Sequence, residues 1–412
     1  MRRRDPSKPP RVLLIVQNLP LPGDRRVWLE CQALKRAGYE VAAISPAGPG
    51  DPRETTLDGV RLYHYPPAPA TGSVGSFVYE FAYSWLQTLR LALRDYRRNR
   101  FDVIQACNPP DTYFALALLF RPLGVRFVFD QHDLCPEVYE SRFDRPRPAL
   151  RRGLLLLEWA TYRTAAHVIS TNESYRANAL GRGRRKPRQV TVVRTGPDES
   201  RMHRGPARPE LRNGRRHLVV YVGVMGPQDG VDVVVDAVDH IVNDLGRTDV
   251  QFAILGAGDC WSELRSRIMR LQLDDVVTMP GRVSDELLFD YLSSADVGLS
   301  PDPPSPLNDV STMNKTMEYM AFGLPVLAFD LKETKVSAGA AAEYVVGDST
   351  EYAIALLKLL DDNERRRQMG EFGRQRVEQV LAWRHQEEGY VGVFDGLLGS
   401  PARRVNHAAI MD

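Results

Sequence analysis

Short, continuous runs of apolar residues recur along the whole chain and constrain its fold more than any other feature. The first run is residues 11–16, and others follow at 41–45, 103–106, 126–130, 167–170 and 190–193. Runs without polar interruption are typical of strands buried on both faces, as in parallel sheets. Between the first two runs, residues 27–37 have helical spacing and end at Gly38. This alternation predicts a doubly wound α/β fold.

A polar interval divides the chain into two halves. Residues 204–216 are rich in Pro, Gly and Arg, which predicts a linker. A second alternation follows, with apolar runs at 218–223, 251–255, 276–279, 297–300 and 325–329. With 412 residues, the chain is long enough for two domains. We therefore expect two Rossmann-like domains, 1–203 and 204–384, with a ligand cleft between them. A terminal helix is predicted at 382–397, and the C-terminal helical segment 385–412 is expected to pack back on the first domain.

Composition excludes several classes of protein. The hydrophobic fraction of 43% and the charged fraction of 26% are those of a globular protein, not a disordered one. A net charge of +2 gives no indication of a nucleic-acid partner. No apolar run is long enough to span a membrane, and the basic start at 1–5 is not followed by an apolar leader. The cysteines lack metal-type spacing and are expected to be reduced thiols in a cytoplasmic protein.

The most informative segment is 308–326. A polar loop, capped by Ser or Thr, is predicted to enter a helix near Thr312. The N–H groups and positive dipole end of a helix N-terminus suit a diphosphate. Lys315 in the first turn either adds a charge to that site or is a solvated lysine. Glu318, one turn further on, either accepts hydrogen bonds from both hydroxyls of a ribose or is an ordinary exposed residue, and Gly323 then ends the helix.

The segment from Asn314 to Val326 resembles the donor motif of the GT-B glycosyltransferases of family 4. Four other segments are similar to motifs of the same family: 221–223 with 230–232, 255–258, 281–283, and 130–137. The likeness extends over residues 10–395. It implies the GT-B architecture and a retaining, hexosyl-type transfer from a UDP- or GDP-type sugar to a saccharide or lipid-linked acceptor, as in polysaccharide biosynthesis.

The resemblance also implies roles for individual residues. The catalytic candidates are His132, as a hydrogen-bond partner of the donor sugar, and Asp309; alternatively, His132 is a histidine without a ligand. No metal or other cofactor is expected, because a helix dipole and basic groups neutralise the departing diphosphate. The donor-binding candidates are Gly223, Gly256, Arg282, Val283, Ser311, Thr312, Met313, Asn314, Lys315 and Glu318; the glycines among them are alternatively ordinary turn residues.

Candidate acceptor-side residues follow predicted strands of the first domain. They are Gly23, Asp24, Asn108 and Asp111. Asp24 either lines the acceptor site or caps the helix at 27–37. Asn108 and Asp111 either face the cleft or belong to a plain Pro-containing turn.

The chain departs from the family pattern at two places. The first residue of the family's acidic pair is replaced by Val310, so that contact with the sugar hydroxyls is expected from Asp309, Asn308 or the backbone. Val224 and Asp229 stand where the family often has Arg and Lys to hold the diphosphate. We therefore expect Lys315 and the helix N-terminus to carry more of the diphosphate here.

Residues 77–100 combine aromatic side chains with a basic end, and residues 145–157 combine arginines with a run of leucines. These stretches either bind an anionic membrane, at the inner face of the plasma membrane, or form core helices with solvated basic ends.

Three other functions remain as alternatives. A nicotinamide-dependent oxidoreductase would need glycine in place of Trp261. A nucleotide-sugar epimerase would use cleft carboxylates such as Asp133 and Glu137, and a non-catalytic protein would only bind a nucleotide.

Overall fold

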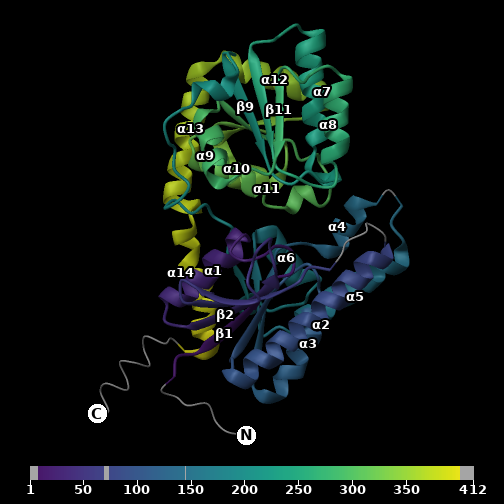
Figure 1. Cartoon of the computed structure of the whole chain (residues 1–412), viewed down its shortest axis with the longest axis vertical. Coiled ribbons are helices and arrows are strands. Elements are labelled where there is room, and N and C mark those ends of the chain that lie inside the picture. Colours follow the sequence, from purple (N-terminus) through teal and green to yellow (C-terminus); the bar gives the residue numbers. More distant parts are fainter. Residues whose placement is uncertain (1–7, 69–73, 144, 400–412) are drawn as a thin grey trace, which may run out of the picture. The chain divides into compact units, whose positions relative to one another are not determined.

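The computed structural model describes residues 8–68, 74–143 and 145–399 (Figure 1). The chain divides into two compact units. The first comprises Met1–Glu140, Arg145–Arg194 and Gln386–Asp412, and the second comprises Ser141–Asp144 and Thr195–His385. The division along the chain thus lies at 194/195, before the boundary at 203/204 expected from the sequence. Each unit is a parallel-sheet α/β structure, which confirms the predicted fold class.

The first unit is built on an eight-stranded sheet of order β3-β4-β2-β1-β5-β6-β7-β8. Its pairs are parallel, except that β3 runs antiparallel to β4. The strands are β1 (Arg11–Ile15), β2 (Glu40–Pro46), β3 (Glu54–Leu57), β4 (Val60–Tyr65), β5 (Val103–Cys107), β6 (Arg126–Gln131), β7 (His167–Ser170) and β8 (Val190–Val192). β3 and β4 were not predicted, because polar residues interrupt their apolar pattern.

Helices surround this sheet. They are α1 (Arg25–Arg36), α2 (Val74–Arg98), α3 (Tyr113–Phe120), α4 (Cys135–Arg142), α5 (Pro148–Thr164), α6 (Glu173–Gly181) and α14 (Trp383–Leu398). The terminal helix was predicted at 382–397 and is found within one residue of those bounds. Residues 400–412 of the expected C-terminal segment lie outside the described residues.

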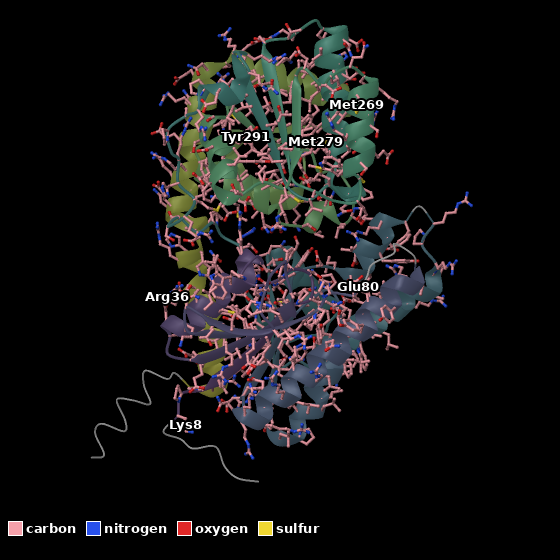
Figure 2. The ribbon with its side chains drawn as sticks, viewed as in Figure 1. Lys8, Arg36, Glu80, Met269, Met279 and Tyr291 are labelled. Carbon is pink, nitrogen blue, oxygen red and sulfur yellow. The ribbon has the colours of Figure 1, made fainter. Side chains whose placement is uncertain are left out.

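Helix α14 packs on the first unit. Arg36 of α1, which is labelled in Figure 2, forms a two-pronged ion pair with Glu387 of α14. Tyr39 Oη donates to Asp395 at 2.6 Å, and Tyr390 is fully buried with its ring against that of Phe394. Figure 1 shows the same proximity as the yellow α14 beside the purple α1. A buried tyrosine and an ion pair therefore hold α14 against the segment of α1 and Tyr39 in the first unit.

The second unit contains a six-stranded parallel sheet of order β11-β10-β9-β12-β13-β14. The strands are β9 (His217–Val222), β10 (Val250–Leu255), β11 (Val277–Gly281), β12 (Val297–Ser300), β13 (Val326–Phe329) and β14 (Ala342–Val345). The α-helices are α7 (Val231–Asp239), α8 (Trp261–Arg270), α9 (Asp285–Ser294), α10 (Asn314–Ala321), α11 (Lys332–Ala338), α12 (Ser349–Asp361) and α13 (Asn363–Arg376). β14 was not predicted from the sequence.

Both faces of this second sheet are buried. Along β9, Leu218 and Val220 belong to one hydrophobic cluster, whereas Val219 and Tyr221 belong to another. Met279, labelled in Figure 2, is buried in the second of these clusters. Because alternate side chains of a strand point to opposite faces, two separate cores cover the sheet. Along β9, polar groups are therefore excluded from the middle of the strand.

The polar interval 204–216 is not an extended linker. The N–H of Gly205 donates to Ser293 Oγ at 2.9 Å, and the N–H of Arg208 donates to Ser294 Oγ at 2.7 Å. Arg212 forms an ion pair with Asp296 at 2.6 Å. The linker prediction was wrong because partners distant in sequence hold this segment against the end of α9.

Helix α2 has a packed face and an exposed one. Thr88, Ala92 and Asp95 are fully buried, whereas Tyr79 and Leu86 are exposed. Phe77 lies among the residues whose side chains the structure does not describe. Among the helices of the described ranges, none is both long enough and apolar enough to cross a membrane.

Candidate functional site

Two glycine loops meet at the carboxyl edge of the second sheet. Gly256 has φ +139°, and a Cβ at this position would lie 1.8 Å from the carbonyl oxygen of Gly223. The N–H of Gly223 donates to the carbonyl of Leu255 at 3.1 Å. A side chain at Gly256 would force these loops apart, so that here the glycine is required by close backbone contact. This edge is where ligands bind in doubly wound sheets.

Helix α10 is fixed at the same edge. Tyr319 Oη donates to the carbonyl of Leu299 at 2.9 Å and accepts the N–H of Val222 at 2.8 Å. Thr316 Oγ1 donates to Ser300 Oγ at 3.2 Å. These bonds anchor α10 to the carboxyl ends of β9 and β12, and they place the first turn of α10 beside the glycine loops.

The start of α10 differs from the prediction. The N-cap residue is Met313, which makes no side-chain capping bond, and the helix begins at Asn314 rather than near Thr312. Ser311 donates its hydroxyl to the carbonyl of Leu307 at 2.8 Å instead of capping the helix. A Ser/Thr cap was therefore the wrong expectation. Without a side-chain acceptor at the N-cap, the positive end of the helix dipole is not neutralised from that position.

Lys315 projects from the first turn of α10 into an ion pair. Its Nζ lies 2.5 Å from Asp302 Oδ1, and the two side chains are 10% and 1% exposed. Asp302 Oδ2 also accepts the hydroxyl of Ser300 at 2.8 Å. Nζ lies 5.4 Å from the ring centroid of Tyr221, within cation–π range. Lys315 is thus mostly covered and paired with Asp302, and the solvated-lysine alternative is wrong.

Asp302 is a site residue that sequence reasoning missed. It stands two residues after β12, where a parallel sheet presents its polar groups. That position was the available signal: a carboxylate immediately after a predicted buried strand. Its partner could not be identified from sequence, because the pairing joins two separate segments.

The loop after β9 offers no side-chain cation in place of the missing Arg and Lys. Val224 is exposed, and Asp229 Oδ2 accepts the N–H of Gly226 at 2.8 Å. Burial raises the pKa of Asp229, and the nearby Lys315 partly opposes this. A Cβ at Gly223 would lie 3.3 Å from Lys315 Cε. Lys315 therefore places a cation against this loop.

Asn308 and Asp309 hold loops together. Asn308 is buried, and its amide donates to the carbonyls of Gln228 and Pro303 at 3.0 and 2.8 Å. Asp309 Oδ1 accepts the N–H of Lys332, at the start of α11, at 2.9 Å. The amide of Asn308 is thus committed to the protein backbone. A contact of Asp309 with a sugar stays a prediction.

The remaining donor-side candidates lie along the same edge. Glu318 is half-buried on α10, one turn after Asn314. Gly281 ends β11, and Arg282 and Val283 follow it; Arg282 is exposed, and Val283 packs against a hydrophobic cluster. The N–H of Gly256 donates to the carbonyl of Gly281 at 3.0 Å, which joins this loop to the glycine loops.

In the first unit, His132 follows β6 and is held from two sides. Its backbone N–H donates to Asn108 Oδ1 at 2.7 Å. Its Nε2 lies 2.8 Å from Asp130 Oδ2 and 3.1 Å from Arg26 Nε. The ring is partly exposed, with its Nε2 side turned toward buried groups.

Asp130 belongs to a buried charge network. Arg26 pairs with Glu30 at 3.1 Å and with Asp130 at 3.0 Å, and the amide of Gln105 donates to both carboxylates. Tyr390 of α14 donates to Gln105 Oε1 at 2.7 Å. Burial and then Asp130 raise the pKa of Glu30 well above its usual range. Burial alone would also raise the pKa of Asp130, but Arg26 and His132 hold it far below.

Sequence reasoning missed this network. Arg26 and Glu30 are an i, i+4 pair on the buried face of α1, which was the available signal. Within the described ranges, one group of metal-type donors occurs here: Cys107, Asp130 and His132, with donor atoms within 4.8 Å of one another. Arg26 already supplies a cation to Asp130, and burial raises the pKa of Cys107. These residues therefore do not fit a metal ion.

The acceptor-side candidates have local partners in the structure. Asp24 caps α1, since its Oδ1 accepts the N–H of Val27 at 3.1 Å, as one of its two interpretations predicted. Asn108 and Asp111 are buried, and the amide of Asn108 donates to Asp111 Oδ1 at 3.0 Å and to the carbonyl of Asp133 at 2.8 Å. Asn108 thereby braces the segment that carries His132. An acceptor role for Gly23, Asp24, Asn108 and Asp111 stays a prediction.

Comparison with known proteins identifies related sequences and folds. Residues 23–196 match a family model described as glycosyl transferase 4-like domain, and residues 216–362 match one described as glycosyl transferases group 1. Spore coat protein SA of Bacillus subtilis is 21% identical over 411 residues, which cover 93% of this chain and 98% of that protein.

Solved structures share the fold at low sequence identity. Sucrose-phosphate synthase from Thermosynechococcus elongatus has a TM-score of 0.74 at 19% identity, covering 94% of this chain and 99% of that one. Anabaena Alr3699/HepE in complex with UDP-glucose has a TM-score of 0.69 at 15% identity, again covering 94% and 99%.

The environment of Asp111 predicts a pH-dependent stability. Burial raises the pKa of this carboxyl group from 3.8 to about 7, and its Oδ2 is buried without a hydrogen-bond partner. The folded state therefore holds the proton more tightly than the unfolded state. The stability that this provides is complete below pH 3.8 and is lost as the pH rises through about 7. The melting temperature of Asp111→Asn minus that of wild type should therefore be higher at pH 8 than at pH 5.

Thermal unfolding of both proteins at the two pH values checks this, with about 2–4 °C expected per kcal/mol for a unit of this size. Asp275→Asn, at an exposed surface carboxylate, is the matched control and should show no such trend. A difference in melting temperature between Asp111→Asn and wild type that is the same at both pH values would contradict the assignment.

Proposed function

We propose, from the premise that this chain belongs to the GT-B glycosyltransferases of family 4, that it transfers a hexose from a UDP- or GDP-type donor with retention of configuration. The acceptor is a saccharide or a lipid-linked saccharide of polysaccharide biosynthesis. The observation that carries the proposal is the arrangement of α10, with its N-terminus, Lys315 and Glu318 at the carboxyl edge of the second sheet.

The donor's diphosphate is assigned to the start of α10. The N-terminus supplies backbone donors and a positive dipole end, and Lys315 supplies the nearest charge. Asp302 holds Lys315 beside Gly223. A diphosphate, with its greater charge, competes with Asp302 for the lysine. The group leaves as a nucleoside diphosphate, so the same contacts stabilise the charge that develops during transfer.

The ribose of the donor is assigned to Glu318, whose carboxylate can accept from both ribose hydroxyls. Arg282 and Val283 are assigned to the base, on the loop that joins Gly256. His132 is assigned as a hydrogen-bond partner of the sugar, because Asn108 and Asp130 fix its backbone and ring. Asp309 is the proposed contact of the sugar hydroxyls.

Transfer with retention is proposed to proceed on one face of the sugar. The departing phosphate oxygen assists removal of the acceptor's hydroxyl proton, so the protein need not supply a base. Nor does the proposal require a metal ion, since the helix N-terminus and Lys315 carry the leaving charge. An epimerase gains no support, because Glu137, one of its two candidate acids, is paired with Arg182 at 2.5 Å.

An anionic membrane is proposed as a partner surface, where a lipid-linked acceptor would be met. On α5, Leu156 is 62% and Trp159 50% exposed, and Arg147 and Arg152 are exposed on the same helix and at its start. Apolar and basic side chains together suit an anionic interface. At the basic end of α2, Arg94 and Arg98 are both paired with Glu54, so α5 contributes more to the proposed attraction than the sequence suggested.

Replacing Glu318 tests the donor assignment. Glu318→Ala removes a charged acceptor, a loss of about 1.5–3 kcal/mol, so UDP should bind roughly tenfold to hundredfold more weakly in titration calorimetry. The matched control is Glu286→Ala, at an exposed position in the first turn of α9. Equal UDP affinity in wild type and Glu318→Ala would contradict the ribose assignment.

The pair of Lys315 and Asp302 gives a second test. Lys315→Met removes the cation and should weaken UDP binding, while leaving Asp302 buried and unpaired at a cost of roughly 3–5 kcal/mol in stability. Asp302→Asn keeps the cation and removes its competitor, so UDP affinity should hold or rise.

The double variant Lys315→Met/Asp302→Asn separates folding from binding. It should recover most of the lost melting temperature without recovering UDP affinity. If it binds UDP as tightly as wild type, Lys315 is a structural residue and the diphosphate assignment to it is wrong.

Flotation with liposomes tests the membrane partner. Binding to vesicles of anionic phospholipid should be measurable at low salt and weaken at high salt, because the charges are screened. Leu156→Ala/Trp159→Ala should reduce it, whereas Val346→Ala, at a 77% exposed residue of the second unit, should not. Absence of wild-type flotation at low salt would refute this partner.

A further inference from the structure

In the described part of the first unit, two buried carboxylates share one guanidinium beside His132. The side chains of Glu30 and Asp130 are 0% exposed, and that of Arg26 is 6% exposed. Arg26 lies 3.1 Å from Glu30 Oε1 and 3.0 Å from Asp130 Oδ1. One guanidinium balances only one carboxylate, and a buried charge without compensation is costly. The second carboxylate is therefore balanced by one proton, either on a carboxyl group or on the ring of His132.

The other titratable groups that face this network supply no positive charge. They are Asp24 at the N-cap of α1, Cys31 on α1, Cys107 on β5 and Tyr390 on α14. Burial raises the pKa of Cys31, Cys107 and Tyr390, so these three groups stay uncharged at neutral pH. Asp24 can only add negative charge. The proton that balances the network therefore lies on a carboxyl group or on His132.

Hydrogen bonds distinguish the two carboxyl groups. Asp130 Oδ1 accepts from Arg26 at 3.0 Å. Its Oδ2 accepts from the amide of Gln105 at 3.0 Å and lies 2.8 Å from His132 Nε2. Glu30 Oε2 accepts from the same amide at 2.7 Å, but Glu30 Oε1 is buried and has no hydrogen-bond partner among the described residues. The Nε–H of Arg26 is directed at His132 Nε2 instead. Because hydrogen-bond donors stabilise the charged form of a carboxyl group, Asp130 keeps the charge and Glu30 takes the proton.

The electrostatic environment of the two carboxyl groups agrees with this assignment. Burial, and then the negative charge of Asp130, raise the pKa of Glu30 well above its usual range. Burial would also raise the pKa of Asp130, but Arg26 and His132 hold it far below its usual range. Two acids that share one site are expected to separate in this way, because they cannot both ionise at low cost.

We propose that Glu30 is a positioning residue that holds the balancing proton, so that the network presents no net charge to His132. An ionised Glu30 would leave the network with a net negative charge, which favours a cationic imidazolium. The catalytic meaning rests on the proposed function, in which His132 binds the donor sugar. A cation at that place would oppose the positive charge that develops on the sugar as the diphosphate departs. Glu30 thus acts through His132 and not by contact with the sugar.

Carboxyl NMR of the full-length protein tests where the proton lies. Glutamate is labelled with ¹³C at the side-chain carboxyl group, and the Glu30 resonance is identified by its absence in Glu30→Gln. At pH 7 this resonance should have the chemical shift of a carboxylic acid. Glu364 is the internal control, because a hydrogen bond from Arg367 lowers its pKa to about 2 and its resonance should be that of a carboxylate. A carboxylate shift for Glu30 at pH 7 overturns the proposal.

A matched pair of substitutions tests the effect on His132, whose ring is followed by ¹³C at histidine Cε1 and identified in His132→Gln. Glu30→Gln imitates the protonated acid, since it has both an acceptor and an N–H donor, and should leave the pH titration of His132 in place. Asp130→Asn removes a charged neighbour at 2.8 Å and should move that titration to lower pH by roughly one to three units. His167, at the start of β7, is the internal control and should titrate alike in all samples.

A merely structural role for Glu30 would not produce this asymmetry. If Glu30→Gln moves the His132 titration as far as Asp130→Asn does, Glu30 is charged in the wild type and the proposal is wrong. If Asp130→Asn does not fold, the wild-type Glu30 resonance and the titration in Glu30→Gln still decide.

A UDP titration of the wild-type sample keeps this proposal distinguishable from the proposed function. If UDP binds and Glu30 is a carboxylate at pH 7, the donor assignment stands and the role of Glu30 fails. If Glu30 is protonated and UDP does not bind, the charge assignment in the network stands and the proposed donor site fails.

Discussion

The strands of the second sheet pair in parallel, and hydrophobic clusters cover both of its faces. This packing determines where polar functional side chains can lie. Along β9, alternate residues enter two separate cores, which leaves no interior position for a polar functional group. Parallel strands also end together at one edge. His132, Asp302 and His64 each lie at or just beyond the carboxyl end of a strand. The sheet determines the positions of these side chains, and the neighbouring loops supply their hydrogen-bond and ion-pair partners.

Buried charges at these edges are matched closely. Arg26 is bonded to Asp130 and lies 3.1 Å from Glu30, and Lys315 is bonded to Asp302. Removing such charges from water is costly, and breaking a pair leaves an unpaired buried charge that is costlier still. In the first network, Gln105 donates to both carboxylates and accepts the hydroxyl of Tyr390. The second network places two carboxylates, Asp302 and Asp229, near Lys315 and beside a helix N-terminus.

Much of the architecture could be predicted from the sequence, because continuous apolar runs identify buried strands directly. β1, β9 and β13 were found this way, and the terminal helix was placed within one residue. The elements missed have mixed composition. β4 contains Arg61 and His64 between its apolar residues, so it lacks the signature of a strand buried on both faces.

The sequence predicts which segments form the candidate site. It does not predict which side chains of those segments contact one another. The donor-motif residues do surround one edge of the second sheet. Their partners, however, come from other segments: Asp302 for Lys315, and Lys332 for Asp309. The N-cap was also wrong, since the N-cap residue is Met313, which offers no side-chain acceptor to the first N–H groups of α10. Side-chain pairs of this kind depend on which loops the strand order brings together, and one sequence does not contain that order.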